Sequence, residues 1–357
     1  MQGYAEGTRA LYCRAMNQYI SFGVGHGLVT ENAQEVRAPR EEDIIFFAAW
    51  LHTVKSQNPG TVRTTLSGLA NELAALGLPN PMKEDDGSYR YNLHRMLRGM
   101  KRKYSGVKKI RLALTTDKLM LANTWLLEHG GLPVVDTVAI SCCMIMGVFF
   151  MLRVSELVAP STTKHSPILN ATLGDVKFLP SMEDPQFVEF TVRNSKQDYF
   201  RQGCVLKVAA NGTSICPVAA VLKLVKSRPH ARPDEPLFVL ANGKYLDRAR
   251  LQKEMRRSLE AVGFKGSDYA THSMRSGGAT SLFCAEGFDG DAVRVLGRWS
   301  SSSYRLYLRH TDKMRRDASL AMARMATADW SKLDRKSFNP DKAEGCHYLT
   351  WKFSIPP

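Results

Sequence analysis

Four short stretches of this sequence carry polar side chains whose combined chemistry suits transfer of a phosphoryl group to a protein hydroxyl. In chain order they are Arg153, Lys196, His272, Arg275, Trp299, Tyr304 and Tyr307. Two arginines can hold the non-bridging oxygens of a phosphodiester with planar, permanently charged guanidinium groups, and they stabilise the charge that develops in the transition state. Arg153 and Arg275 are the candidates, and this chemistry requires no metal ion.

The remaining side chains offer a nucleophile and routes for protons. A tyrosine hydroxyl is a poor nucleophile while protonated, because its free pKa is about 10, so a base or the field of the arginines must assist it. His272 can accept that proton or position the phosphate. Lys196 can protonate a leaving 5′ hydroxyl as a general acid, and Trp299 can donate one hydrogen bond from its indole nitrogen.

Each stretch also has an ordinary structural interpretation. Arg153 ends a strongly apolar helix, where its charge needs a partner, and Glu156 can orient it. The alternative is an arginine that reaches solvent and forms only an intrahelical ion pair. A lysine in a polar turn, such as Lys196, is usually just solvated, and residues 296–309 can be an aromatic helix after a serine-rich loop.

The stretch over residues 271–280 makes a more specific prediction. His272 and Arg275 are three residues apart and therefore share one face of a helix, which can be a surface accident. Gly277 and Gly278 follow in the same helix, where each glycine costs about 1 kcal/mol relative to alanine. Such a cost suggests a backbone requirement, and we expect this helix to pack very closely against a neighbour.

The first hundred residues are predicted to be all helical, as one domain over residues 1–105. Apolar residues recur at helical spacing over 8–22, 41–54, 61–76 and 91–103, with glycine or proline breakers between them. A dense basic segment follows, and we expect the domain linker at 106–114. The cations of this region are Lys101, Arg102, Lys103, Lys108, Lys109 and Arg111. They are candidate DNA contacts; the alternatives are a solvated surface or a nuclear-import signal.

From residue 115 onward the pattern changes to mixed helix and strand, which predicts a second domain over 115–329. Residues 187–192 and 204–208 are rich in β-branched and aromatic side chains and flank a polar stretch, so we expect a hairpin with Lys196 near its tip. Helices are expected over residues 217–226 and 245–262. The tail, residues 330–357, has aromatic residues but little periodicity, and we expect it to pack on another surface.

Composition limits the partners. The chain has 357 residues, 44% of them hydrophobic, and a formal charge of +15, which favours a polyanion such as nucleic acid or an acidic membrane surface. No stretch reaches the roughly 20 apolar residues that span a bilayer, and the N-terminus lacks a secretory signal pattern. We therefore expect an intracellular protein, nuclear in a eukaryote. The seven cysteines include no Cys-x-x-Cys pair, so we expect reduced thiols, no metal and no cofactor.

The order of these motifs resembles the catalytic set of the tyrosine recombinases, the integrase family. Leu152-Arg153-Val154-Ser155-Glu156-Leu157 resembles the family's first arginine motif, and Ser195-Lys196-Gln197-Asp198 its hairpin lysine motif. Cys216-Pro217-Val218 resembles the start of the next helix, and residues 272–280 are similar to the family's His-Ser-x-Arg-x-Gly-Gly-Ala-Thr box. The likeness covers about residues 115–326.

One departure lies between Trp299 and Tyr307, whose spacing is one residue shorter than in the usual bacterial enzymes. Gly297-Arg298-Trp299-Ser300-Ser301 instead resembles recombinases of eukaryotic mobile elements of the Crypton and DIRS kind. Two nucleophiles are then possible. We favour Tyr307, because Tyr307-Leu308-Arg309 resembles the family's Tyr-Ile-Arg, and we expect Tyr304 in the core.

The resemblance implies a helical, SAM-like core-binding domain that clamps DNA, followed by a mainly helical catalytic domain with a small antiparallel sheet. It implies site-specific recombination through a 3′-phosphotyrosine, without metal or ATP, by a homo-oligomer, usually a tetramer on two double-stranded DNA sites. The tail over residues 330–357 could be exchanged between protomers. The helices over residues 61–76 and 245–262 are candidates for reading base edges. Two alternatives stay open: a catalytically silent DNA-binding descendant, and a type IB topoisomerase-like activity.

Overall fold

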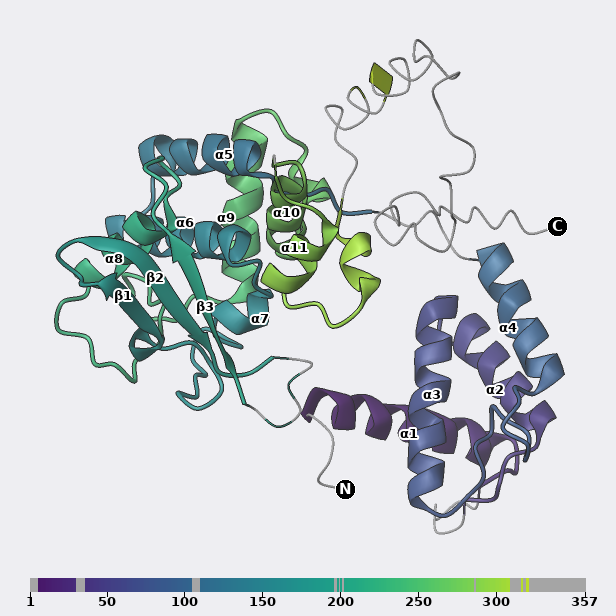
Figure 1. The fold of residues 1–357 in the computed structure, drawn as a ribbon. Helices are drawn as coiled ribbons and strands as arrows, with labels where there is room; N and C mark the ends of the chain where they lie inside the picture. The colour runs from purple at the N-terminus through teal and green to yellow at the C-terminus, as the bar shows by residue number, and fades with distance from the viewer. Residues whose placement is uncertain are drawn as a thin grey trace, which may run out of the picture. The chain divides into compact units, whose positions relative to one another are not determined.

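The chain folds into two compact units, residues 1–109 and 110–357. The structure is a computed structural model that describes residues 6–29, 36–104, 110–195, 198, 200, 202–285, 287–308, 316 and 319–320. Figure 1 shows helices in the first unit and, in the second, a small sheet accompanied by helices.

The described part of the first unit is built from helices, as the sequence predicted. These are α1 (Glu6–Gly25), α2 (Glu41–Thr53), α3 (Pro59–Ala75) and α4 (Tyr91–Tyr104). Asn58 caps α3 by accepting a hydrogen bond from the Thr61 amide at 3.0 Å, and Pro59 fits the first turn, where no amide hydrogen is needed. Phe22 and Phe47, with ring centroids 5.3 Å apart, lie in the buried core between the helices.

The second unit combines helices with a three-stranded antiparallel sheet of order β1-β2-β3. The strands are β1 (Val176–Pro180), β2 (Pro185–Val192) and β3 (Cys204–Ala209). The helices are α5 (Thr116–His129), α6 (Val134–Phe149), α7 (Val154–Leu157), α8 (Pro217–Lys226), α9 (Arg248–Ala261), α10 (His272–Phe283) and α11 (Gly290–Leu296), with 3-10 turns η1 (Leu173–Asp175), η2 (Gly266–Asp268) and η3 (Ser302–Leu306). This all-helical unit followed by a mainly helical unit with a small sheet confirms the predicted fold class.

The predicted hairpin is present, but two elements differ from the sequence-based expectation. β2 and β3 pair from Phe187 with Ala209 to Val192 with Cys204, which confirms the hairpin. β1 was not predicted, because its five residues are too short to show a clear alternation. α9 begins at Arg248 rather than Tyr245, since the Asp247 carboxylate accepts a hydrogen bond from the Arg250 amide and so caps the helix there.

α6 forms the apolar centre of the second unit. It is buried over nearly its whole length and packs against α5, α8, α9 and α10, while α8 also packs on β2 and β3. An apolar helix of this kind is stabilised mainly by the surface it removes from water. The chain leaves α6 at Phe149 and reaches Arg153, the N-cap of α7, so the core helix fixes where this arginine emerges.

α10 packs on its neighbours through Gly277 and Gly278, as predicted. A Cβ atom at Gly277 would collide with the carbonyl of Leu114, and one at Gly278 would collide with the carbonyl of Val148 in α6. The two missing side chains therefore let the backbone of α10 touch the backbone of two other segments. This contact sets the position of His272 and Arg275, which lie in the first turns of the same helix.

Residues 110–114, which the sequence placed in the linker, run along the second unit. The amide of Leu112 donates to the carbonyl of Asp268 at 2.9 Å, and the amide of Leu114 donates to the carbonyl of Ser273 at 2.9 Å. Leu114 is fully buried. The side chain of Arg111 donates to the carbonyl of Ser267.

We predict that Gly277→Ala lowers the free energy of unfolding of the second unit by about 1–3 kcal/mol, because the added methyl group overpacks the contact with Leu114. Urea unfolding of the full chain measures this change. Gly99→Ala is the control: its site in α4 is open, so alanine should raise the stability of the first unit by about 0.5–1 kcal/mol. A Gly277→Ala protein as stable as the parent would contradict the close packing.

Candidate active site

Arg275 is the buried centre of the candidate site. Its side chain is 0% exposed; Nη1 donates to the carbonyl of Met151 and Nη2 donates to the carbonyl of Gly297 at 2.6 Å. Burial, followed by the nearby charges of Arg153 and Arg298, lowers the pKa of Arg275 to about 10. The guanidinium therefore remains a cation at neutral pH, held by two segments that are distant in the sequence.

The backbone has a positive φ at, or directly after, each of the two residues whose carbonyl groups bind Arg275. Met151 has a φ of 48°, and Arg298, directly after Gly297, has a φ of 58°. Residues other than glycine rarely adopt this left-handed conformation, and each costs about 1 kcal/mol or more unless its surroundings compensate. The hydrogen bonds to a buried charge are such a compensation, because charge-assisted bonds are among the stronger ones.

Glu156 joins two further arginines. Its Oε1 accepts a hydrogen bond from Nη1 of Arg153 at 2.9 Å, and its Oε2 accepts from the backbone amide of Arg153 and from Nη2 of Arg298, both at 2.9 Å. Burial raises the pKa of Glu156, but the charges of, and hydrogen bonds from, Arg298 and Arg153 outweigh burial and leave the pKa below its usual value. The carboxylate is thus ionised between two cations, as expected of a residue that orients an arginine.

Two aromatic side chains lie over the guanidinium of Arg275. Its Cζ lies 4.2 Å from the ring centroid of Trp299 and 5.8 Å from that of Tyr307. The Tyr307 ring in turn lies 4.9 Å from the His272 ring and 5.0 Å from the Trp299 ring, centroid to centroid. The fold therefore brings together His272, Arg275, Trp299 and Tyr307 from three separate elements.

The two candidate tyrosines differ in burial. Tyr304 is 7% exposed and belongs to a small core with Met151, Val293 and Trp299. Tyr307 is half-buried at the end of η3, where its carbonyl accepts a hydrogen bond from the hydroxyl of Thr280 at 3.4 Å. Tyr307 is therefore the one nearer to solvent, next to His272.

The cluster has an excess of positive charge. Arg153, Arg275 and Arg298 face one carboxylate, Glu156, among the described side chains, which leaves two net positive charges. The indole Nε1 of Trp299 and the Nε atoms of Arg275 and Arg298 are buried with no hydrogen-bond partner among the described residues. Buried donors without acceptors are costly, so the site is suited to an anion.

Lys196 lies outside the described residues, but the paired strands of its hairpin approach the site at the end next to the turn. Nη1 of Arg298 lies 3.7 Å from Sγ of Cys204, the first residue of β3. At the turn, the carboxylate of Asp198 accepts hydrogen bonds from the amides of Gln202 at 3.0 Å and Gly203 at 2.7 Å. The hairpin that is predicted to carry Lys196 therefore has Cys204, the first residue of its second strand, beside Arg298.

Arg298 is a site residue that the sequence-based reasoning missed. The signal was available, because Arg298 directly precedes Trp299 and stands one residue further from Tyr307. Arg298 is therefore nine residues before Tyr307, whereas Trp299 is eight residues before it. From this stretch, the sequence-based candidates were only Trp299, Tyr304 and Tyr307.

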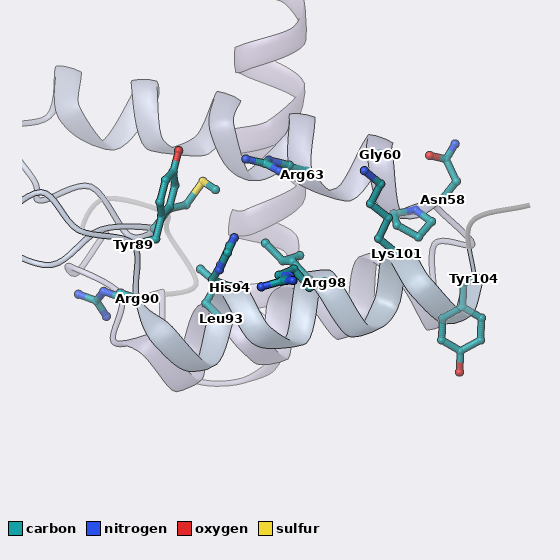
Figure 2. A pocket seen from close by; sticks show the side chains of 13 residues that line it. Asn58, Gly60, Arg63, Tyr89, Arg90, Leu93, His94, Arg98, Lys101 and Tyr104 are labelled. Atoms are coloured by element: carbon teal, nitrogen blue, oxygen red, sulfur yellow. The ribbon is translucent and has the colours of Figure 1, made fainter. Parts of the chain in front are cut away.

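The first unit contains a basic groove of about 680 Å³ between the start of α3 and α4 (Figure 2). Its cationic lining residues are Arg63, Arg90, Arg98 and Lys101, His94 lies among them, and the described lining residues include no acidic side chain. Figure 2 shows Arg98 and Lys101 on α4 and Arg63 on α3 around the same space. Tyr89, Leu93 and Leu97 contribute apolar surface, so the groove combines positive charge with an apolar floor.

The structure describes only part of the basic segment that the sequence proposes as a DNA contact. Lys101, Arg102 and Lys103 are exposed in the last turn of α4, whereas Lys108 and Lys109 lie outside the described residues. The tail over residues 330–357 also lies outside the described residues, as does its proposed exchange.

The two helices considered for base reading differ in what their side chains already bind. In α9, Arg250 and Arg257 lie 3.4 and 3.0 Å from carboxylate oxygens of Glu254, and Arg256 donates to the carbonyl of Tyr269 at 3.0 Å. These arginines are engaged inside the second unit. In α3, Arg63 is exposed beside the groove.

Two kinds of feature are absent from the described part of the chain. It contains no group of three or more His, Cys, Asp or Glu side chains placed to hold a metal ion. None of its helices combines the length and the apolar character needed to cross a membrane.

Comparison with known proteins shows the fold. No protein-family model and no curated protein matches this sequence. Among solved structures, XerH site-specific recombinase bound to difH substrate is 14% identical with a TM-score of 0.55, covering 88% of this chain and 78% of that one. The Tn1549 transposon integrase in complex with transposon right end DNA is 14% identical with a TM-score of 0.55, covering 90% and 95%. A lambda integrase tetramer bound to a Holliday junction is 14% identical with a TM-score of 0.50, covering 87% and 75%.

These similar structures are recombinases and integrases, and the chain has the tyrosine recombinase fold over most of its length. At 14% identity the likeness establishes the fold and not the activity. The closer likeness to recombinases of the Crypton and DIRS kind stays a prediction.

We predict that Arg275→Lys lowers the free energy of unfolding of the second unit by about 1–3 kcal/mol. Lysine keeps the charge but cannot span the carbonyls of Met151 and Gly297 with two separate nitrogens, so one buried acceptor loses its partner. Thermal or urea unfolding measures the change, with the exposed Arg305→Lys as control. Equal stability of Arg275→Lys and the parent would show that the two carbonyls do not depend on the arginine.

Proposed function

We propose that this chain is a DNA-breaking and rejoining tyrosine recombinase, with Tyr307 as its nucleophile. The observation that carries the proposal is the convergence of Arg275, His272 and Trp299 on the ring of Tyr307. Arg153 lies close enough to lower the pKa of Arg275. The printed descriptions of the similar structures name site-specific recombinases and integrases on DNA, which supports the same reaction class.

The charge of the site suits the transition state of phosphoryl transfer. A phosphodiester carries one negative charge and gains a second as the nucleophile adds, and the described cluster has two net positive charges. Preorganised guanidinium groups stabilise this charge without reorganisation of water. Arg153 and Arg275 are the proposed phosphate ligands, and Trp299 adds an indole donor and fills the space beside them.

The proposed reaction replaces one phosphate ester bond with another at each step. The hydroxyl oxygen of Tyr307 attacks the scissile phosphorus, the bond from phosphorus to the 5′ oxygen breaks, and a 3′-phosphotyrosine forms. His272 accepts the tyrosine proton, and Lys196 protonates the leaving 5′ oxygen. A 5′ hydroxyl of the partner duplex then attacks the phosphotyrosine in the reverse reaction, which rejoins DNA without ATP, a metal ion or another cofactor.

The aromatic rings must move before this reaction can begin. Arg275 is fully covered, and the rings of Trp299 and Tyr307 lie over its guanidinium. A phosphate can reach Arg275 only if the Tyr307 ring swings aside, toward a position in line with the scissile bond. The same covering favours a second candidate function, a DNA-binding protein of this fold that no longer cuts.

The first unit supplies affinity through charge. The groove between α3 and α4 has cations and no acidic lining residue, which suits the phosphate backbone of double-stranded DNA. Lys101, Arg102 and Lys103 extend the same charge along the last turn of α4, and Lys108, Lys109 and Arg111 are proposed as further DNA contacts. We propose that the working form is a homo-oligomer, a tetramer on two DNA sites, and that the protein acts inside the cell, in the nucleus of a eukaryote.

A suicide DNA substrate tests the chemistry, because loss of the nicked 5′ fragment traps a covalent intermediate. We predict that the parent and Tyr304→Phe form a tyrosyl-DNA adduct, whereas Tyr307→Phe forms none, since it lacks the attacking oxygen. Denaturing electrophoresis measures the adduct. Lys196→Ala should slow adduct formation by about 100-fold or more through loss of the general acid.

The outcomes separate the two candidate functions. Tight DNA binding by the parent with no adduct would favour the silent DNA-binding protein. An adduct in Tyr307→Phe that disappears in Tyr304→Phe would assign the reaction to Tyr304.

We predict that Arg63, Arg98 and Lys101, replaced together by glutamine, weaken DNA binding at every sequence tested and lower its dependence on salt. Each lost phosphate contact should reduce the slope of log affinity against log salt by about 0.9. Fluorescence anisotropy at several salt concentrations measures the slope. Lys244→Gln, at an exposed position in the second unit, is the control, and an unchanged slope in the triple variant would argue against the groove as a DNA contact.

A further inference from the structure

Arg298 has no part in the reaction steps proposed above, yet the fold holds it at a cost. Its backbone has a φ of 58°, which residues other than glycine rarely adopt. Its side chain is only 18% exposed, and its Nε is buried with no partner among the described residues. A strained backbone that carries a cation into a site already rich in arginine calls for a function that depends on this charge.

The contacts of Arg298 lead to Arg153 through one carboxylate. Nη2 of Arg298 donates to Oε2 of Glu156 at 2.9 Å, while Nη1 of Arg153 donates to Oε1 at 2.9 Å. The backbone amide of Arg153 also donates to Oε2 at 2.9 Å. Both oxygens of Glu156 are therefore occupied, and its side chain is 1% exposed.

We propose that Arg298 is a positioning residue for DNA cleavage, which fixes Arg153 toward the scissile phosphate by holding the shared carboxylate of Glu156. This role rests on the proposed recombinase function. Arg298 acts through Glu156 and needs no contact with DNA.

Local structure alone would position Arg153 poorly. Arg153 and Glu156 are three residues apart at the start of α7, which has only four residues, so this pair alone connects Arg153 to nothing outside its own short helix. Arg298 arrives from a segment 142 residues further along the chain and binds the second carboxylate oxygen. This long-range contact ties α7 to the segment that leads into Tyr307.

Arg298 also preserves the charge that Arg153 offers to an anion. One arginine paired with one carboxylate would be neutral as a unit, whereas two arginines around Glu156 keep a net positive charge. Nη1 of Arg298 lies 3.7 Å from Sγ of Cys204, in the last strand pair before the turn of the hairpin. A single side chain thus connects the segment before the nucleophile, the arginine at α7 and the strand that leads from the hairpin.

The pH dependence of cleavage reports this role. The charged groups that face Glu156 are Arg153 at the start of α7, Arg298 after α11 and, at longer range, Arg275 of α10, while Cys204 of β3 faces Arg298. Burial raises the pKa of Glu156, and Arg298 is foremost among the groups that lower it. Removing Arg298 therefore raises this pKa, so the carboxylate should lose its charge at a higher pH as the solution is acidified.

The test is single-turnover cleavage of a suicide DNA substrate by the full chain, measured across pH. In Arg298→Gln, we expect the rate of adduct formation at neutral pH to fall by about 100-fold, because a misplaced catalytic group costs that much. The acid limb of the rate profile should move to higher pH, while DNA affinity stays within about twofold. Arg298→Lys should recover part of the rate, since its ammonium group can still bind one oxygen of Glu156.

A double-mutant cycle decides whether Arg298 acts through Glu156. In a Glu156→Gln background, Arg298→Gln should cause little further loss, because the carboxylate that links the two arginines is already gone. Arg294→Gln is the matched control: it lies four residues earlier, pairs with Asp291 at 3.1 Å on the surface and should leave the rate unchanged. Thermal unfolding of each variant identifies proteins that fail to fold, and Arg298→Lys then carries the comparison.

Three results would overturn the role of Arg298. These are a parent-like rate and pH profile in Arg298→Gln, an equal loss in the parent and Glu156→Gln backgrounds, and a weakening of DNA affinity that accounts for the whole change in rate. The last two would indicate direct contact of Arg298 with DNA. A parent chain that binds DNA but forms no adduct would instead overturn the proposed recombinase function, and with it any role of Arg298 in cleavage.

Discussion

The second unit is organised around the buried charge of Arg275. A guanidinium with no exposed surface is very unfavourable unless its donors find acceptors, and here the acceptors are the carbonyls of Met151 and Gly297. Those carbonyls belong to segments more than 120 and more than 20 residues away in sequence. Satisfying one charge therefore joins the end of the α6 segment, α10 and the segment after α11, which are the parts of the chain that carry Arg153, His272 and Tyr307.

Backbone contact makes this arrangement possible. α10 can bring Arg275 so close to α6 because Gly277 and Gly278 have no Cβ atoms to collide with Leu114 and Val148. The positive φ angles of Met151 and Arg298 turn the chain on either side of the guanidinium. The fold accepts these local costs because the long-range hydrogen bonds and the buried apolar surface around α6 compensate them.

The two units divide binding and chemistry in the proposed function. In the first unit, exposed cations line a groove and α4, where attraction to phosphate is independent of sequence and sensitive to salt. In the candidate site of the second unit, Arg275 is buried, and the half-buried Arg153 and Arg298 share the carboxylate of Glu156. Charges in such a low-dielectric setting interact strongly with a phosphate placed among them, so the second unit suits transition-state stabilisation better than general affinity.

The sequence alone determined the helical first unit, the mixed second unit, the hairpin and the close packing of α10, because periodicity, breakers and a glycine pair are local signals. It also determined which residue types are available for phosphoryl transfer. The sequence also predicted that Tyr304 lies in the core. Only the tertiary structure placed Arg298 on Glu156, left Tyr307 half-buried at the edge of that core, and covered Arg275 with two aromatic rings. These features depend on contacts between distant segments, and no local pattern encodes which carboxylate or carbonyl a buried cation will meet.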